Sequence, residues 1–171
     1  MLGLLGWRIG FDPALPAYIV FGLAGVALAL VDADHRRLPD VLTLPSYAVG
    51  ALLLGLAAAS GSDSGSYPRA LAGAAIGFGT YALLFVAVRS GIGAGDVKYA
   101  GVVGMHAGWL GWGSLTVAVI GGFVVGGLLS ILLLVSRRVG LKSALPFGPS
   151  MVAGALIGIV WGEPIAAAWF A

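Results

Sequence analysis

The chain has 171 residues, of which 60% are hydrophobic and only 9% are charged. A soluble domain carries about 25% charged residues, because its surface has to be hydrated. The formal net charge of +2 comes from few, scattered basic residues, which excludes the clustered basic face of a nucleic-acid-binding protein. The absence of cysteine excludes disulfides and thiolate metal sites. The composition therefore indicates an integral membrane protein, and the length indicates one domain over residues 1–171.

Six segments are apolar enough to cross the hydrocarbon core of a bilayer, which needs about 20 residues of helix. We expect these spans at about 15–31, 42–59, 70–88, 96–112, 115–135 and 151–168. The fourth is the least apolar, because it contains Lys98 and His106. The sequence thus predicts an all-α polytopic membrane protein. The stretch before the first span has one arginine and no clear small-residue cleavage site, so we interpret it as the mature start of the protein and not as a signal peptide.

The distribution of basic residues predicts the orientation of the chain. With six spans, seven of the nine basic residues fall on one side: Arg36, Arg37, Arg89, Lys98, Arg137, Arg138 and Lys142. Only Arg8 and Arg69 fall on the other side. The positive-inside rule makes the richer side cytoplasmic. We therefore expect both termini to be extracytoplasmic and the protein to lie in the inner or plasma membrane as a multi-pass protein.

Small residues recur at the spacing that favours close helix contacts in membranes. The chain contains four GxxxG pairs: Gly73/Gly77, Gly122/Gly126, Gly154/Gly158 and Gly158/Gly162. We expect these glycines to form contacts within the bundle and not a dimer interface. No repeat of fixed period is visible, so the sequence gives no support to an inverted-repeat transporter.

The acidic residues are few: Asp12, Asp32, Asp34, Asp40, Asp63, Asp96 and Glu163. Four of them fall in two clusters, DADHRRLPD at 32–40 and GAGD at 93–96, both at the expected cytoplasmic ends of spans. A carboxylate at membrane depth is costly unless it is paired or hydrated, so it is a functional candidate by default. Asp32 and Asp96 are the two that we favour for function. Asp34 is interpreted as a loop residue, and the three acids in the outer segments as solvated or interfacial charges.

Glycines alternate at positions 91, 93 and 95, immediately before Asp96. Glycine adopts backbone conformations that are closed to other residues, and it lets a second chain approach closely. We expect such a turn to hold a carboxylate beside an extended peptide. The motif G-x-G-D is by itself a weak signal, because glycine-rich turns before helices are common.

Taken together, the two acidic clusters resemble the type IV prepilin peptidases and the archaeal preflagellin peptidases. The matching residues are DADHRRLPD at 32–40, GAGDVK at 93–98 and LPFGPSMVAG at 145–154, and the resemblance extends over most of the chain. It implies that Asp32 and Asp96 are the catalytic pair. We expect Asp40, Gly93, Gly95 and Lys98 to support them, although for Lys98 the alternative of an interfacial anchor is equally open.

The resemblance implies a membrane aspartyl endopeptidase that cleaves leader peptides of prepilin-like proteins at the cytoplasmic face. Its partners would be prepilin or pseudopilin leader peptides and the lipid bilayer, with no nucleic acid, cofactor or metal. Longer bacterial members of that family carry an N-terminal portion linked to N-methylation, often with paired cysteines. Nothing in this sequence corresponds to that portion. We therefore expect the peptidase-only form without methyltransferase activity.

Two carboxylates held close together share a proton, so that one activates water and the other protonates the scissile carbonyl. Asp96 opens an expected helix and Asp32 closes one. The helix dipole favours an anion at the first position and disfavours it at the second. On this argument Asp96 is the general base and Asp32 the general acid, although the roles can exchange within a coupled pair.

Two alternatives to a peptidase stay open at this point. One is a small proton-coupled transporter whose paired acids carry protons, and the other is a non-enzymatic scaffold of a pilus or secretion machine. A transporter would more naturally place its acids near the midplane, on broken helices. The sequence has no HExxH motif of a zinc protease, and His106 is interpreted as a packed polar residue.

Overall fold

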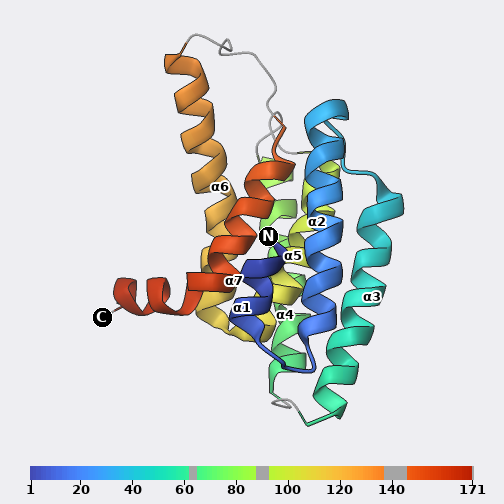
Figure 1. Cartoon of the computed structure of the whole chain (residues 1–171). Helices are drawn as coiled ribbons and strands as arrows, with labels where there is room; N and C mark the ends of the chain where they lie inside the picture. The colour runs from blue at the N-terminus through green and yellow to red at the C-terminus, as the bar shows by residue number, and fades with distance from the viewer. Residues whose placement is uncertain (62–64, 88–92, 137–145, 171) are drawn as a thin grey trace.

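The computed structural model describes residues 1–61, 65–87, 93–136 and 146–170, and within these ranges every regular element is an α-helix (Figure 1). The helices are α1 (Leu2–Ile9), α2 (Leu15–His35), α3 (Asp40–Ala59), α4 (Ser66–Ala87), α5 (Ala94–Leu110), α6 (Trp112–Val135) and α7 (Gly148–Phe170). The expectation of an all-α protein is confirmed.

Helices α2 to α7 run alternately up and down through one bundle (Figure 1) and match the six expected spans within a few residues. Five of them, α2, α3, α4, α6 and α7, are long and apolar enough to cross a membrane. The other, α5, has only 17 residues, and residues 99–109 of it are all buried by the surrounding helices. The least apolar span is therefore the one that the other helices cover, and His106 lies within the covered part.

The difference from the expected boundaries that matters for the acidic residues is at the end of α2. This helix does not stop before the cluster DADHRR but continues through His35, and Arg36 caps it with a left-handed backbone (φ 53°). Residues 32–35 of the cluster are thus helical, and the link to α3 begins at Arg36. As a result Asp32 is buried inside the last turn of α2, whereas Asp34 is exposed.

The glycines of the GxxxG pairs all face a neighbouring segment of the same bundle. A Cβ atom on Gly73 or Gly77 of α4 would overlap backbone oxygens of α5, and one on Gly154 or Gly158 of α7 would overlap the backbone of α6. A Cβ atom on Gly162 would also overlap the backbone of α6, whereas one on Gly122 or Gly126 would overlap the side chain of Tyr81 or Phe147. Small residues let these backbones come together where hydrophobic exclusion offers no driving force. The interpretation of these glycines as contacts within the bundle is confirmed.

Both ends of the chain contain features that the span pattern did not indicate. The N-terminal stretch forms the short helix α1, whose buried Leu5 packs against Gly22 of α2. Helix α7 contains Pro164, and beyond it the last turns bend away from the bundle (Figure 1). Proline removes an intrahelical hydrogen bond, which accounts for this bend.

Two charged side chains, those of Arg69 and Glu163, form hydrogen bonds to the backbone on either side of the turn between α5 and α6. Arg69 donates hydrogen bonds from Nε to the carbonyl of Gly108 (2.7 Å) and from Nη2 to that of Trp109 (2.6 Å), at the C-terminus of α5. The Oε1 atom of Glu163 accepts a hydrogen bond from the N–H of Ser114 in the first turn of α6 (2.8 Å). A cation at a helix C-terminus and an anion at an N-terminus are both stabilising. Glu163 therefore has a structural partner and is not simply a solvated charge.

Some of the residues named from the sequence lie outside the described residues: Asp63, Arg89, Gly91, Arg137, Arg138, Lys142 and Leu145. The side of the membrane on which the termini lie stays a prediction.

Candidate active site

Asp32 joins the end of α2 to the beginning of α7. Its side chain is only 4% exposed, and its Oδ2 accepts a hydrogen bond of 2.7 Å from the N–H of Gly148, the first residue of α7. A Cβ atom on Gly148 would lie 2.9 Å from that Oδ2 and 3.0 Å from the Cβ of Asp32. Only glycine therefore lets the start of α7 come this close to the carboxylate.

Asp96 lies in the first turn of α5 and is 7% exposed. Its Oδ2 accepts a hydrogen bond of 2.9 Å from the N–H of Gly93, the residue that caps the helix. This is the side-chain half of a capping box, which satisfies a backbone donor just ahead of the helix. The carboxylate is thus held at the N-terminal end of α5 by its own helix.

The structure brings the ends of the two helices together. The backbone of Leu38, in the short link that follows α2, lies against Gly95 in the first turn of α5: a Cβ atom there would be 2.8 Å from the Cβ and 3.0 Å from the carbonyl oxygen of Leu38. Leu38 follows Asp32 by six residues and Gly95 immediately precedes Asp96, so this contact brings together the ends of the helices that carry the two acids. Two carboxylates far apart in sequence therefore share one end of the bundle.

The expectation of an unusual backbone conformation is wrong for Gly93 and Gly95, whereas their place beside an extended peptide stays a prediction. Among the described residues, the glycines with positive φ are Gly10 and Gly61. Gly93 has an ordinary extended backbone (φ −80°), and Gly95 belongs to the helix. An unusual backbone conformation therefore does not explain why positions 93 and 95 are glycine. At Gly95 the reason is the close approach of another segment of the chain, because the Leu38 backbone leaves no room for a side chain there.

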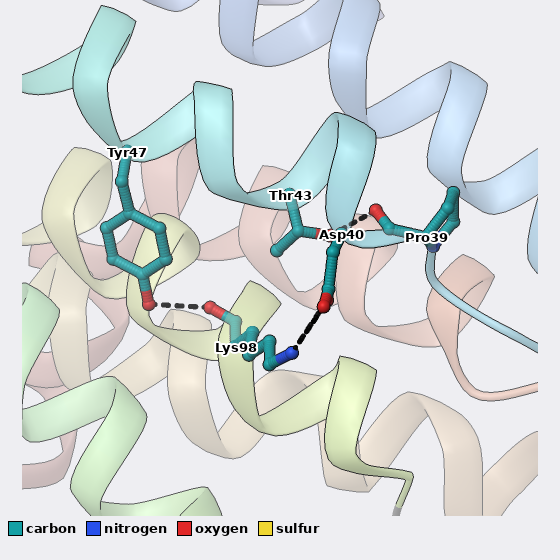
Figure 2. Close-up of polar contacts among 5 residues, drawn as sticks. All are labelled: Pro39, Asp40, Thr43, Tyr47 and Lys98. Atoms are coloured by element: carbon teal, nitrogen blue, oxygen red, sulfur yellow. Dashed lines mark hydrogen bonds and ion pairs between the residues drawn. The ribbon is translucent and has the colours of Figure 1, made fainter.

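Asp40 and Lys98 form an ion pair beside this site (Figure 2). The Nζ of Lys98 donates to both carboxylate oxygens of Asp40, at 2.7 and 2.8 Å. The side chain of Asp40 is 54% exposed, and that of Lys98 is 36% exposed. Tyr47 donates its hydroxyl to the carbonyl of Lys98 (2.6 Å), and Thr43 donates to the carbonyl of Pro39 (3.1 Å). Lys98 is thus paired with Asp40 and links α5 to α3.

Two residues of this region were not singled out from the sequence. Gly148 lies in the stretch LPFGPSMVAG, so the motif that carried the resemblance was the signal that could have identified it. For Tyr47 the sequence gives no signal, because its importance depends on a contact with α5. The hydrogen bond from Gly148 also changes the argument about helix dipoles. Asp32 closes α2, but it lies at the N-terminus of α7, where an anion is favoured.

His106 lies deep in the bundle and is 1% exposed. Its Nδ1 forms a hydrogen bond with the carbonyl of Val102 (2.9 Å), and its ring stacks on Phe21 with centroids 4.5 Å apart. This is the environment of a packed polar residue. Nowhere in the described ranges do three His, Asp or Glu side chains gather as a metal site would require.

Comparison with known proteins gives a consistent family. The sequence profile of the type IV leader peptidase family matches residues 19–131. The chain is 32% identical over 168 residues to the prepilin leader peptidase/N-methyltransferase of Pseudomonas aeruginosa, covering 95% of this chain and 55% of the relative. For the protein of the same name from Stutzerimonas stutzeri the identity is 30% over 172 residues, with 98% and 57% covered.

A shorter relative is the leader peptidase HopD of Escherichia coli, 33% identical over 162 residues that make up 91% of this chain and 98% of that protein. The chain spans about half the length of the two prepilin leader peptidase/N-methyltransferases. No solved structure is significantly similar to it. The profile match over most of the chain and the helical bundle agree: the chain belongs to the type IV leader peptidase family and is a multi-pass protein of the inner membrane.

Proposed function

We propose that the protein is an aspartyl endopeptidase that cleaves the leader peptides of prepilin-like proteins at the cytoplasmic face of the membrane. The observation that carries the proposal is that Asp32 and Asp96 are both buried and that the helix ends carrying them lie against each other at one end of the bundle. Within the described ranges, the one ion pair is that of Lys98 with Asp40, so neither buried carboxylate has a cationic partner. Two uncompensated carboxylates at close range are most stable when they share a proton.

The hydrogen bonds around the pair leave one oxygen of each carboxylate for chemistry. Backbone N–H groups of Gly148 and Gly93 hold the Oδ2 atoms of Asp32 and Asp96. In the proposed reaction the ionised carboxylate removes a proton from water, and the water oxygen attacks the scissile carbonyl carbon. The protonated carboxylate gives its proton to the carbonyl oxygen. The resulting tetrahedral intermediate collapses as the amide nitrogen takes up a proton and leaves, with no covalent bond to the enzyme.

The assignment of acid and base needs revision. Both carboxylates lie at a helix N-terminus, Asp96 at that of α5 and Asp32 at that of α7. The helix dipoles therefore favour the ionised form of both carboxylates and do not distinguish the acid from the base. We propose that the two act as one coupled pair with a shared proton, and that the apparent pKa values of the reaction belong to the pair.

The relatives support a peptidase of this kind. The names of these relatives describe leader peptidases. The name of HopD mentions a leader peptidase alone, and the match covers 98% of the length of HopD. We propose peptidase activity without N-methyltransferase activity for residues 1–171, which form one domain. The position of the acids in the last turn of α2 and the first turn of α5 also differs from the midplane site on broken helices that a transporter would use.

The test is cleavage of a purified prepilin, with a basic leader before an apolar helix, by the purified protein in detergent. Asp32→Asn and Asp96→Asn should each abolish cleavage without changing the melting temperature greatly, because an amide cannot exchange the proton. The matched control is Asp34→Asn, which neutralises an exposed carboxylate two residues from Asp32 and should stay active. An active Asp96→Asn enzyme would remove the aspartyl mechanism.

A further inference from the structure

Three contacts tie the beginning of α3 to the beginning of α5. Lys98 and Asp40 form the bidentate ion pair, Tyr47 donates to the Lys98 carbonyl, and the Leu38 backbone lies against Gly95 (Figure 2 shows the first two). We infer that Asp40, Tyr47 and Lys98 form a clamp that positions the catalytic carboxylates, an inference that rests on the proposed function. The name clamp refers to these three residues below.

The clamp connects the two carboxylates through short lengths of chain. Asp40 begins α3, and only the link over residues 36–39 separates α3 from the helix that carries Asp32. Lys98 is two residues beyond Asp96 on α5. A shift of α3 relative to α5 is therefore transmitted to the spacing between Asp32 and Asp96.

The packing beside the clamp explains why such a device is useful. An apolar pocket of about 430 Å³ opens between α3, α4 and α5, lined by Leu44, Tyr47, Ala74, Ala75, Phe78 and Lys98. The pocket is largely open to the outside, and α3 and α4 make few contacts with each other. Where packing does not determine the position of a helix, polar contacts at its end contribute more to fixing that position.

The sequence of α5 is adapted to the tyrosine of the clamp. A Cβ atom on Gly101 would overlap the hydroxyl of Tyr47. Glycine at this position therefore lets the ring lie flat enough on α5 for its hydroxyl to reach the Lys98 carbonyl. Tyr47 and Gly101 are thus matched to each other across two helices.

The clamp acts through position and not through direct contact with the reacting atoms. Residues two apart on an α-helix point about 200° from one another, so Lys98 is directed toward α3 and away from the Asp96 carboxylate. Its ion pair is substantially exposed, and exposed pairs contribute little to stability. Loss of the pair should therefore slow cleavage more than it lowers the melting temperature.

The experiment compares kcat and KM for prepilin cleavage in Lys98→Gln, Asp40→Asn, Tyr47→Phe and Lys98→Arg. We expect kcat to fall on the order of 10-fold in the first two and a few-fold in Tyr47→Phe, with KM nearly unchanged, because displacement of a catalytic group by a fraction of an ångström has such an effect. Lys98→Arg keeps the charge and should retain most of kcat. Asp34→Asn is the control for a lost charge outside the clamp.

Each outcome decides a different question. Wild-type kcat in Lys98→Gln would overturn the clamp while leaving the proposed peptidase intact, and so would a Lys98→Arg enzyme as slow as Lys98→Gln. A loss of melting temperature in proportion to the loss of kcat would show a merely structural role and would also overturn it. Absence of cleavage by the wild-type protein would overturn the proposed function itself, and the clamp with it.

Discussion

The substitution Gly148→Ala tests whether the start of α7 holds Asp32 in place. The new Cβ atom would lie 2.9 Å from Oδ2, 3.0 Å from Cβ and 3.2 Å from Cγ of Asp32. Non-bonded heavy atoms prefer about 3.5–4.0 Å. Either the Asp32 side chain or the first turn of α7 must therefore move by roughly 0.5–1 Å, and the hydrogen bond from the Gly148 N–H must lengthen from 2.7 Å.

The consequence for catalysis follows from this displacement. Misplacement of a reacting group by ~1 Å can cost on the order of 100-fold in rate. We therefore expect kcat for prepilin cleavage to fall roughly 10- to 100-fold in Gly148→Ala. Alanine in a helix is favoured over glycine by up to about 1 kcal/mol, which offsets part of the strain. The melting temperature in detergent should accordingly change little.

The assay measures kcat with a purified prepilin and, in parallel, thermal unfolding in the same detergent. Gly127→Ala is the matched control, because a Cβ atom on this glycine of α6 would have no atom within 4 Å; its kcat should equal that of the wild type. If Gly148→Ala cleaved at the wild-type rate, the contact between α7 and Asp32 would have no role in catalysis.

Three further predictions follow. Gly95→Val should lower kcat more than the melting temperature, because its side chain would meet the Leu38 backbone; near wild-type cleavage would mean that this contact does not position Asp96. Single cysteines in place of the exposed Ser60 and Ser136 should be labelled from opposite sides of the membrane, with position 136 cytoplasmic; labelling from the same side would contradict the orientation. Arg69→Met should lower the melting temperature, because it leaves two carbonyls of α5 without their donors, at about 1–3 kcal/mol each; an unchanged melting temperature would show that water replaces the guanidinium.

Much of this protein could be predicted from its sequence. A helix must present about 20 apolar residues to cross a bilayer, so length and hydropathy alone located the segments that became α2 to α7. The glycine pairs indicated contacts within the bundle, because membrane helices pack through small residues. The position of the acids at the ends of spans and the family resemblance singled out Asp32 and Asp96, and both are buried.

The contacts between helices were decided only by the tertiary structure. The sequence placed Asp32 at the C-terminus of its own helix, but not at the N-terminus of α7, because which helices become neighbours depends on the packing of the whole bundle. The same holds for Tyr47, which matters through a carbonyl of α5, and for Glu163, which caps α6. The local sequence pattern indicates which secondary structure a segment prefers. The role of each of these side chains depends instead on a partner on another helix. For Gly95 the motif identified the right residue, and only the position of the Leu38 backbone supplied the reason.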